Sequence, residues 1–424
     1  MFYSLLFIYI LVLSVPFWGR KSKDYFSPVS LFSILLFINT VPFMAIAFTD
    51  KYIVTEPVLQ KVGGNYNSLM QIFMVNQILF NICYFFGYYR TRYSSLRFFD
   101  NTYKENKLLL IYFLLAIVPL LYTISFISSM GGVEGLLGVI NDRTTLMEDR
   151  TIIFILCNFA IYLAGAFHIK YMSVHGVSKL QLFLDIFIAF IVLSSQGGRS
   201  PFILYLINIA VCYNYFVGKL NLFSIKLVPF YIFVVGFVVG MYVLRTSKDV
   251  EISTKVVSDN LSVFVSGNSY VDIQLLIIDF FNNADHWLGE SFKGLFGIFL
   301  PRSLYPDKLP IDEGIFVHEM TYSYQDVFRC KDFYISYPPS TIGIMYANFS
   351  YLGVCVGGLV LGYIHKKIYS LFTQSKGVLL AYIYVFTIIK FQITVFYIAN
   401  VCYIIILLFL LRIFLRSFEK RQQI

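Results

Sequence analysis

Long apolar runs separated by short polar stretches dominate this chain. Windows of 18 or more apolar residues recur along it, and an α-helix needs about 20 such residues to cross a bilayer. The pattern therefore predicts an all-α polytopic membrane protein with about eleven transmembrane helices. They are expected near residues 2–19, 28–48, 68–88, 108–129, 152–170, 180–196, 201–217, 227–244, 341–364, 377–390 and 394–416.

Composition supports this class. The chain has 424 residues, of which 58% are hydrophobic and 13% charged, with a mean hydropathy of +0.72, whereas a soluble domain carries about 25% charged residues. The first apolar run has no basic residue before it and Arg20, Lys21 and Lys23 after it. A secretory signal peptide has the opposite flanks, so we interpret this run as a retained span.

Charge distribution between the loops predicts the orientation. One set of loops is short and almost purely basic, while most acidic residues lie in the other set. By the positive-inside rule the basic set is cytoplasmic, which places the amino terminus outside and the carboxyl terminus inside the cell. The net charge of +9 is accounted for by these loops, and no nucleic-acid partner is expected.

The spans divide the chain into three parts. Residues 1–244 hold spans one to eight, residues 245–340 form one large external loop, and residues 341–424 hold the last three spans and a cytoplasmic tail. Loops of this length are commonly functional. Two apolar pieces within it, "YVDIQLLIIDFF" and "GESFKGLFGIFLP", are too hydrophobic for disorder and are expected to form interfacial or re-entrant helices.

The stretch "SSQGGRSPF" places a permanent positive charge between two apolar spans. In the predicted topology Arg199 lies at the external end of spans six and seven. Ser200 and Pro201 suit the N-cap and N1 positions of a helix. A helix N-terminus presents free N–H groups, and an arginine beside it favours a phosphate or pyrophosphate site. A capped turn with a snorkelling arginine explains the same residues equally well.

A second external helix start follows the large loop in "YPPSTIGIMYANFSYLGVCVGGLVLGY". Ser340 or Thr341 is predicted to cap span nine. Gly353, Gly357 and Gly358 form a small-residue face, which indicates close helix packing more than catalysis.

Further charged groups are predicted on the same side. Arg143, Arg245, Arg302 and Lys308 would favour a polyanionic headgroup, although each alone is ordinarily a solvated charge. Candidate proton acceptors follow in "PIDEGIFVHEM", where a general base needs a pKa tuned by burial. These are Asp312, Glu313, His318 and Glu319, and an ordinary polar loop explains them as well.

Several function classes are disfavoured. The chain has no nucleotide-binding, zinc-protease or nucleophile-elbow motif, and its six cysteines have no paired spacing, so neither an ATP-driven pump nor a metal site is indicated. Asp185 is the one clear intramembrane acid. An ion-coupled transporter would usually carry more.

At these residues the chain resembles bacterial oligosaccharide repeat-unit polymerases of the O-antigen polymerase (Wzy) type, within a GT-C-like superfamily shared with O-antigen ligases. The resemblance rests on the large external loop, the "GGRSP" turn, and "PRSLYPDK" followed by "PPSTIGIMYANFSYLG". It covers most of residues 180–364. Tyr305 stands where that family usually has tryptophan.

The resemblance implies a metal-independent, inverting glycosyltransferase of the bacterial inner membrane that needs no cofactor and works at the periplasmic face. Its donor and acceptor would be undecaprenyl-diphosphate-linked oligosaccharides in the lipid membrane, and a polysaccharide chain-length regulator is a candidate partner. His318 or Glu313 would be the base, with Arg302 assisting the leaving diphosphate. The residues expected to bind pyrophosphate or glycan are Arg143, Arg199, Ser200, Arg245, Arg302, Lys308, Tyr334 and Ser340.

Two alternatives stay open. An O-antigen ligase would share the loop and its arginines but transfer a finished glycan once. A lipid-linked oligosaccharide flippase would be expected to have a cationic cavity at mid-bilayer and no large external loop.

Overall fold

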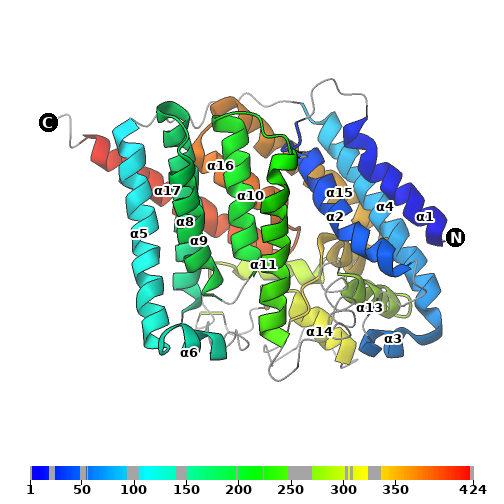
Figure 1. The fold of residues 1–424 in the computed structure, drawn as a ribbon. Helices are drawn as coiled ribbons and strands as arrows, with labels where there is room; N and C mark the ends of the chain where they lie inside the picture. The colour runs from blue at the N-terminus through cyan, green and yellow to red at the C-terminus, as the bar shows by residue number, and fades with distance from the viewer. Residues whose placement is uncertain are drawn as a thin grey trace. The chain divides into compact units, whose positions relative to one another are not determined.

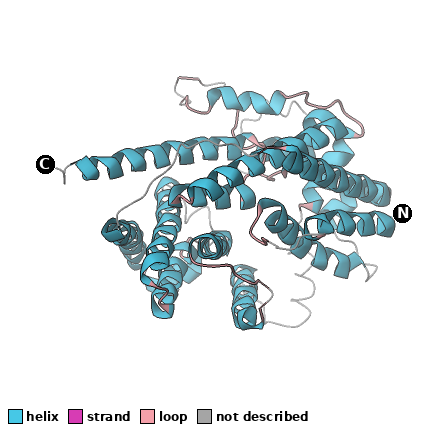
Figure 2. Ribbon diagram, turned by 90° about the horizontal axis from the view of Figure 1, so that it is seen from above, coloured by secondary structure: helices cyan, strands magenta, loops and turns pink. Residues whose placement is uncertain are grey.

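The protein is described by a computed structural model in which every regular element is helical over the described residues (Figures 1 and 2). The described residues are 2–18, 24–47, 54, 56–92, 105–139, 150–196, 199–222, 224–246, 270–300, 304–305, 309–322 and 336–420. They divide into two compact units. Unit 1 comprises Met1–Tyr93, Thr254–Lys367 and Lys390–Ile424, and unit 2 comprises Ser94–Ser253 and Ile368–Ile389.

A helix lies at each of the eleven predicted spans. These are α1 (Phe2–Ser14), α2 (Pro28–Ala47), α4 (Tyr66–Arg90), α5 (Glu105–Ser129), α8 (Thr151–His175), α9 (Lys179–Ser194), α10 (Arg199–Phe216), α11 (Val228–Thr246), α15 (Thr341–Ser375), α16 (Val378–Ile389) and α17 (Val395–Lys420). The agreement follows from the bilayer, because a backbone in hydrocarbon must satisfy its own hydrogen bonds and does so as a helix.

Length and composition support a multi-pass membrane protein. Among the described residues, four helices are long and apolar enough to cross a bilayer, namely Val58–Arg90, Leu108–Ser129, Ile153–His175 and Thr341–Ser375. Shorter apolar helices accompany them at Phe2–Phe17, Pro28–Ile38, Ser200–Phe216, Val378–Ile389 and Val395–Phe409.

The predicted loops contain further helices. They are α3 (Glu56–Val62), α6 (Gly132–Val139), α13 (Val271–Phe281), α14 (Gly314–Tyr322) and the 3-10 helix η4 (Glu290–Gly297). Helices α13 and η4 coincide with the two apolar pieces of the large loop, so the prediction that these form helices is confirmed. In unit 1, α13 packs against α3, α4 and α14 (Figure 1), and it buries Leu275, Ile277 and Ile278 in the core. Helix α13 is thus a packed element of unit 1.

Glycines let α4 and α15 approach backbone to backbone inside unit 1. A Cβ atom on Gly362 would lie 2.1 Å from the carbonyl oxygen of Tyr84, and one on Gly358 would lie 2.4 Å from that of Phe80. The prediction of close packing is therefore right. Gly353 and Gly357, however, face Met345 of α15 itself, across a break in that helix.

The break divides α15 into residues 341–348 and 351–375, so the predicted span nine is interrupted within its length. Phe349 (φ −141°) and Ser350 (φ 55°, ψ −147°) leave the helical region. For a serine this conformation costs about 1–3 kcal/mol unless neighbouring contacts support it. The buried Asn348 supplies such contacts: its Oδ1 accepts from Gly289 N at 3.0 Å and its Nδ2 donates to Ser291 Oγ at 2.8 Å.

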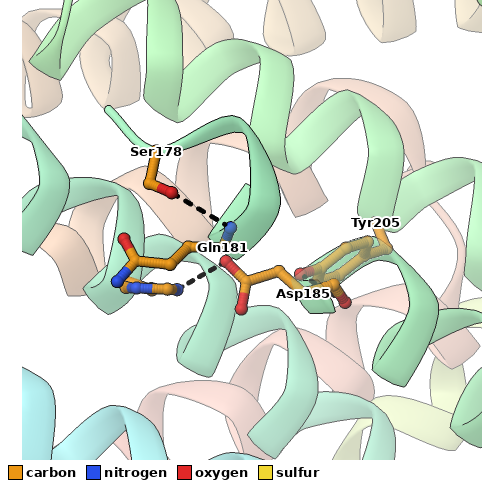
Figure 3. Close-up of polar contacts among 5 residues, drawn as sticks. Ser178, Gln181, Asp185 and Tyr205 are labelled. Carbon is orange, nitrogen blue, oxygen red and sulfur yellow. Dashed lines mark hydrogen bonds and ion pairs between the residues drawn. The ribbon is translucent and has the colours of Figure 1, made fainter. Parts of the chain in front are cut away.

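Unit 2 is organised around α8, which packs against α5, α9, α10 and α16. The turn from α8 to α9 has the expected end signals. Gly176 follows α8 with φ 93°, a conformation that favours glycine, and Ser178 Oγ accepts from Gln181 N at 3.4 Å as the N-cap of α9 (Figure 3).

Candidate functional site

The structure describes only some of the predicted site residues. Arg199 and Arg245 are placed by their backbones, at the first residue of α10 and near the end of α11, and their side chains lie outside the described part. Ser200 is exposed. The remaining basic and aromatic candidates lie outside the described residues: Arg143, Arg302, Lys308 and Tyr334. The side chains that can be analysed are therefore mainly those of Glu313, His318 and Ser340.

Helix α14 begins in a tightly folded corner of unit 1. Asp312 Oδ1 accepts from Gly314 N at 2.9 Å, and Gly314 O accepts from Tyr337 N at 3.0 Å. A Cβ atom on Gly314 would lie 2.8 Å from the backbone carbonyl carbon of Tyr337, so only glycine suits this position. The corner therefore fixes the positions of the two predicted bases, Glu313 directly before α14 and His318 within it.

Glu313 is buried, with 1% of its surface exposed, and it binds the N-terminus of α17. Its Oε1 accepts from Val395 N at 2.5 Å and its Oε2 from Phe396 N at 3.5 Å. The first N–H groups of a helix have no partner within the helix, and the positive end of the helix dipole favours a carboxylate there. Glu313 therefore joins α14 to α17 as a capping group.

Burial raises the pKa of Glu313 from 4.5 to about 7. The cost of removing the carboxylate from water exceeds the opposing effect of the backbone hydrogen bonds, and nearby Asp312 raises the pKa further. Glu313 thus titrates near neutral pH, although both of its oxygens already accept hydrogen bonds.

This titration predicts how stability depends on pH. Between pH 4.5 and 7 the folded chain keeps a proton on Glu313 that the unfolded chain has lost, so the free energy of unfolding should fall as pH rises through this window. The full effect is at most about 3 kcal/mol. Glu313→Gln keeps a side-chain acceptor for Val395 N but has no proton to lose. Unfolding in detergent at pH 5 and pH 8 should show a shallower slope for the variant, and equal slopes would contradict the assignment.

His318 is more accessible than Glu313. Its side chain is 18% exposed, its Nδ1 lies 3.6 Å from Glu319 Oε1, and its ring centroid lies 5.1 Å from that of Tyr337. The separation from Glu319 suits an ion pair when the imidazole is protonated and is too long for a hydrogen bond. The two predicted bases therefore differ in solvent exposure, because the side chain of His318 is accessible to solvent and that of Glu313 is not.

Ser340 belongs to a polar network that the sequence did not indicate. Its Oγ accepts from Gly343 N at 3.2 Å, which confirms it as the N-cap of α15. The same oxygen accepts from Gln274 Nε2 at 2.9 Å, and Gln274 Oε1 accepts from Gln77 Nε2 at 3.1 Å. The Ser340 hydroxyl thus ties α15 to α13 and α4 in unit 1, and two donors already occupy it.

In unit 2, helix α8 holds both sides of the turn that carries Arg199. The side-chain amides of Asn158 and Gln196 exchange two hydrogen bonds of 3.0 and 2.9 Å before the turn. After it, Tyr162 Oη donates to Pro201 O at 2.8 Å. Helix α10 begins at Arg199, which puts Ser200 and Pro201 inside its first turn. The predicted N-cap at Ser200 is therefore misplaced by about two residues, an offset common at helix ends.

Asp185, the predicted intramembrane acid, pairs with His168 in unit 2. His168 Nδ1 lies 2.5 Å from Asp185 Oδ2, and both residues are buried. The ring of Tyr112 stacks on His168 with centroids 4.2 Å apart. Tyr205 Oη donates to the carbonyl oxygen of Asp185 at 3.4 Å (Figure 3). The pair connects α8 to α9, because a charge buried in hydrocarbon requires a partner.

The described residues contain no group of three or more histidine, cysteine, aspartate or glutamate side chains that could hold a metal ion. Comparison of the chain with protein-family models, curated proteins and solved structures found no match.

Proposed function

We propose that this chain is a membrane glycosyltransferase that polymerises undecaprenyl-diphosphate-linked oligosaccharide repeat units at the periplasmic face of a bacterial inner membrane. The growing glycan moves from its diphosphate carrier onto the non-reducing-end sugar of a new lipid-linked unit. Support comes from the resemblance in residues 180–364 and from the packing of the described residues of the large loop within unit 1.

One observation carries the proposal. The segment with Arg302 and Lys308 connects η4 to α14, the helix that carries His318. Before it, Leu300 N donates to Gly297 O at 3.1 Å at the end of η4. After it, Leu309 packs against the core of unit 1, and α14 follows at Gly314. Arg302 and Lys308 thus lie in the sequence directly before the helix that carries His318, where the proposal needs cations for a diphosphate.

In the proposed reaction His318 is the base. A hydroxyl oxygen of the acceptor sugar attacks the anomeric carbon of the donor from the face opposite the diphosphate. The new carbon–oxygen bond forms as the bond to the diphosphate oxygen breaks, and the hydroxyl proton passes to a ring nitrogen of His318. Undecaprenyl diphosphate leaves with the bonding electron pair.

Cations assist this departure because negative charge grows on the leaving diphosphate. Arginine suits the role, since its planar guanidinium remains charged and binds phosphate through two parallel hydrogen bonds. We assign this role to Arg302 in the large loop, and to Arg199 and Arg245 as the sequence alone predicts. Glu313 acts through its position: by joining α14 to α17 it holds the helix that carries His318.

The glycans of a strain that lacks this chain test the proposal. Loss of polymer with one repeat unit still transferred to the surface would support a polymerase. A ligase would instead be indicated if lipid-linked polymer accumulated without transfer. A flippase would be indicated if repeat units remained on the cytoplasmic face of the membrane.

A further inference from the structure

Part of the large loop exposes apolar side chains to an unusual extent. Phe296 is 87% exposed, Phe299 63% and Leu300 45%, all within or directly after η4. Upstream, Leu288 is 77% exposed. Clustered exposure of large apolar groups marks contact with another apolar surface, such as a membrane.

This part of the loop runs alongside α17, within unit 1. A Cβ atom on Gly294 would lie 3.4 Å from Cγ1 of Val395, the first residue of α17. Further on, Tyr403 Oη donates to Ile298 O at 3.3 Å, and the rings of Phe299 and Tyr403 lie 6.0 Å apart. Val395 and Tyr403 are about 12 Å apart along a helix axis. From Gly294 to Phe299 the loop therefore follows α17 for about two turns.

The apolar surface of the loop is continuous with that of α17. Val395–Phe409 is an apolar helix, and on the face that carries Tyr403 it exposes Phe396 at 43% and Ile406 at 45%. Lipid is the ordinary covering for such side chains on a membrane helix. Through the contact of Phe299 with Tyr403, the exposed side chains of η4 extend the same surface.

Several backbone groups of the loop form hydrogen bonds within the protein, as hydrocarbon requires. Trp287 N donates to Ala347 O and Leu288 N to Asn348 O, each at 3.0 Å, at the break of α15. Further bonds run from Phe292 N to Gly289 O, from Ile298 N to Leu295 O and from Leu300 N to Gly297 O. Irregular backbone at membrane depth is tolerated only when protein groups bind its polar atoms.

Charge is confined to the beginning of η4. Glu290 and Lys293 form an ion pair of 2.5 Å, with side chains 44% and 59% exposed. From Gly294 to Leu300 the sequence "GLFGIFL" has no charged residue. The segment is thus charged near the first residue of α17 and apolar beside the turns of α17 that follow.

We propose that residues 294–300 form a re-entrant segment that enters the hydrocarbon of the membrane beside α17, with Phe296 and Phe299 in contact with lipid chains. The sequence left open whether the second apolar piece of the loop is interfacial or re-entrant, and we propose that it is re-entrant. The inference does not depend on the enzymatic activity, since it rests on the contacts with α17 and on the exposed side chains.

Tryptophan fluorescence in vesicles of phosphatidylcholine and phosphatidylglycerol tests the depth. The full chain, with Trp18 and Trp287 replaced by phenylalanine, would carry either Phe296→Trp or the matched Lys293→Trp on the same short helix. Lipids brominated on their acyl chains should quench the tryptophan at 296 roughly twofold or more, because such quenching requires contact within the hydrocarbon. The tryptophan at 293 should respond mainly to aqueous iodide.

Two results would overturn the proposal. Quenching of the tryptophan at 296 by iodide as strongly as at 293 would make the segment an aqueous loop. Protection at 296 from both quenchers would mean that protein covers it. If the tryptophan variants fail to fold, benzoylphenylalanine at position 296 of the natural chain should photo-crosslink to phospholipid, and the same group at 293 should crosslink much less. Equal crosslinking at both positions would again overturn it.

Discussion

Gly362→Val should prevent unit 1 from folding stably. The valine Cβ would lie 2.1 Å from Tyr84 O and 2.9 Å from Tyr88 N. Both are backbone atoms of α4, so relief requires that an entire helix move away from α15. Overpacking ordinarily costs about 1–3 kcal/mol, and a clash with backbone lies at or above the top of this range. Thermal unfolding in detergent should show a large loss of stability, and little protein should accumulate in the membrane.

Gly236→Val is the matched control for Gly362→Val. Gly236 also lies within a helix, α11, but a Cβ atom there would have no heavy atom within 4 Å. This variant should unfold at about the temperature of the natural chain. If Gly362→Val were equally stable, the close contact between α4 and α15 would be wrong.

Arg199→Ala and Arg302→Ala should each abolish long-chain polymer while the protein still inserts in the membrane. Removal of one group that stabilises charge in a transition state commonly lowers kcat about 100–1,000-fold. Single repeat units should accumulate on the lipid carrier, measured as the glycan ladder of cells that express each variant at the natural level. Normal long-chain polymer from both variants would exclude these arginines from the reaction.

Lys293→Ala is the control for the arginine variants. It also removes a positive charge from the large loop, but Lys293 is exposed and pairs with Glu290. Exposed pairs of this kind contribute about 0–1 kcal/mol, so its glycan ladder should match that of the natural chain. A general dependence on positive charge in the loop would instead shorten the ladder for this variant too.

Much of the helical arrangement could be predicted because the bilayer imposes it. Long apolar runs leave the backbone no alternative to a helix, and a helix lies at each of the eleven predicted runs. The break of α15 at Phe349 and Ser350 has no such signal in the sequence. It depends on Asn348 and on N–H groups from Trp287 and Leu288, which are distant in the sequence.

Some polar pairs of unit 2 could have been found from the turn between α8 and α9. His168 and Asp185 are equally far from Gly176 and Val177, and so, to within a residue, are Asn158 and Gln196. An antiparallel helical hairpin places such residues opposite each other, so two buried polar residues at matching positions are a usable signal. The link from Gln77 through Gln274 to Ser340 offers no such symmetry and depends on tertiary packing.

The sequence identified which residues of the candidate site can titrate, but it did not show what each of them does. "PIDEGIFVHEM" identified Glu313 and His318 as titratable groups near the end of the large loop. Periodicity could not show that Glu313 would bind the N-terminus of α17, because that contact joins residues on either side of the whole of α15 and α16. Glu313 is buried at this contact, whereas His318 is accessible to solvent. His318 is therefore the proposed base.

The glycan ladder of a strain without the chain is the most direct test of the central proposal. We expect surface glycans that carry one repeat unit and no polymer, with the full ladder restored when the natural chain is expressed again. An unchanged ladder would contradict a polymerase, and so would the loss of all surface glycan, including the single repeat unit.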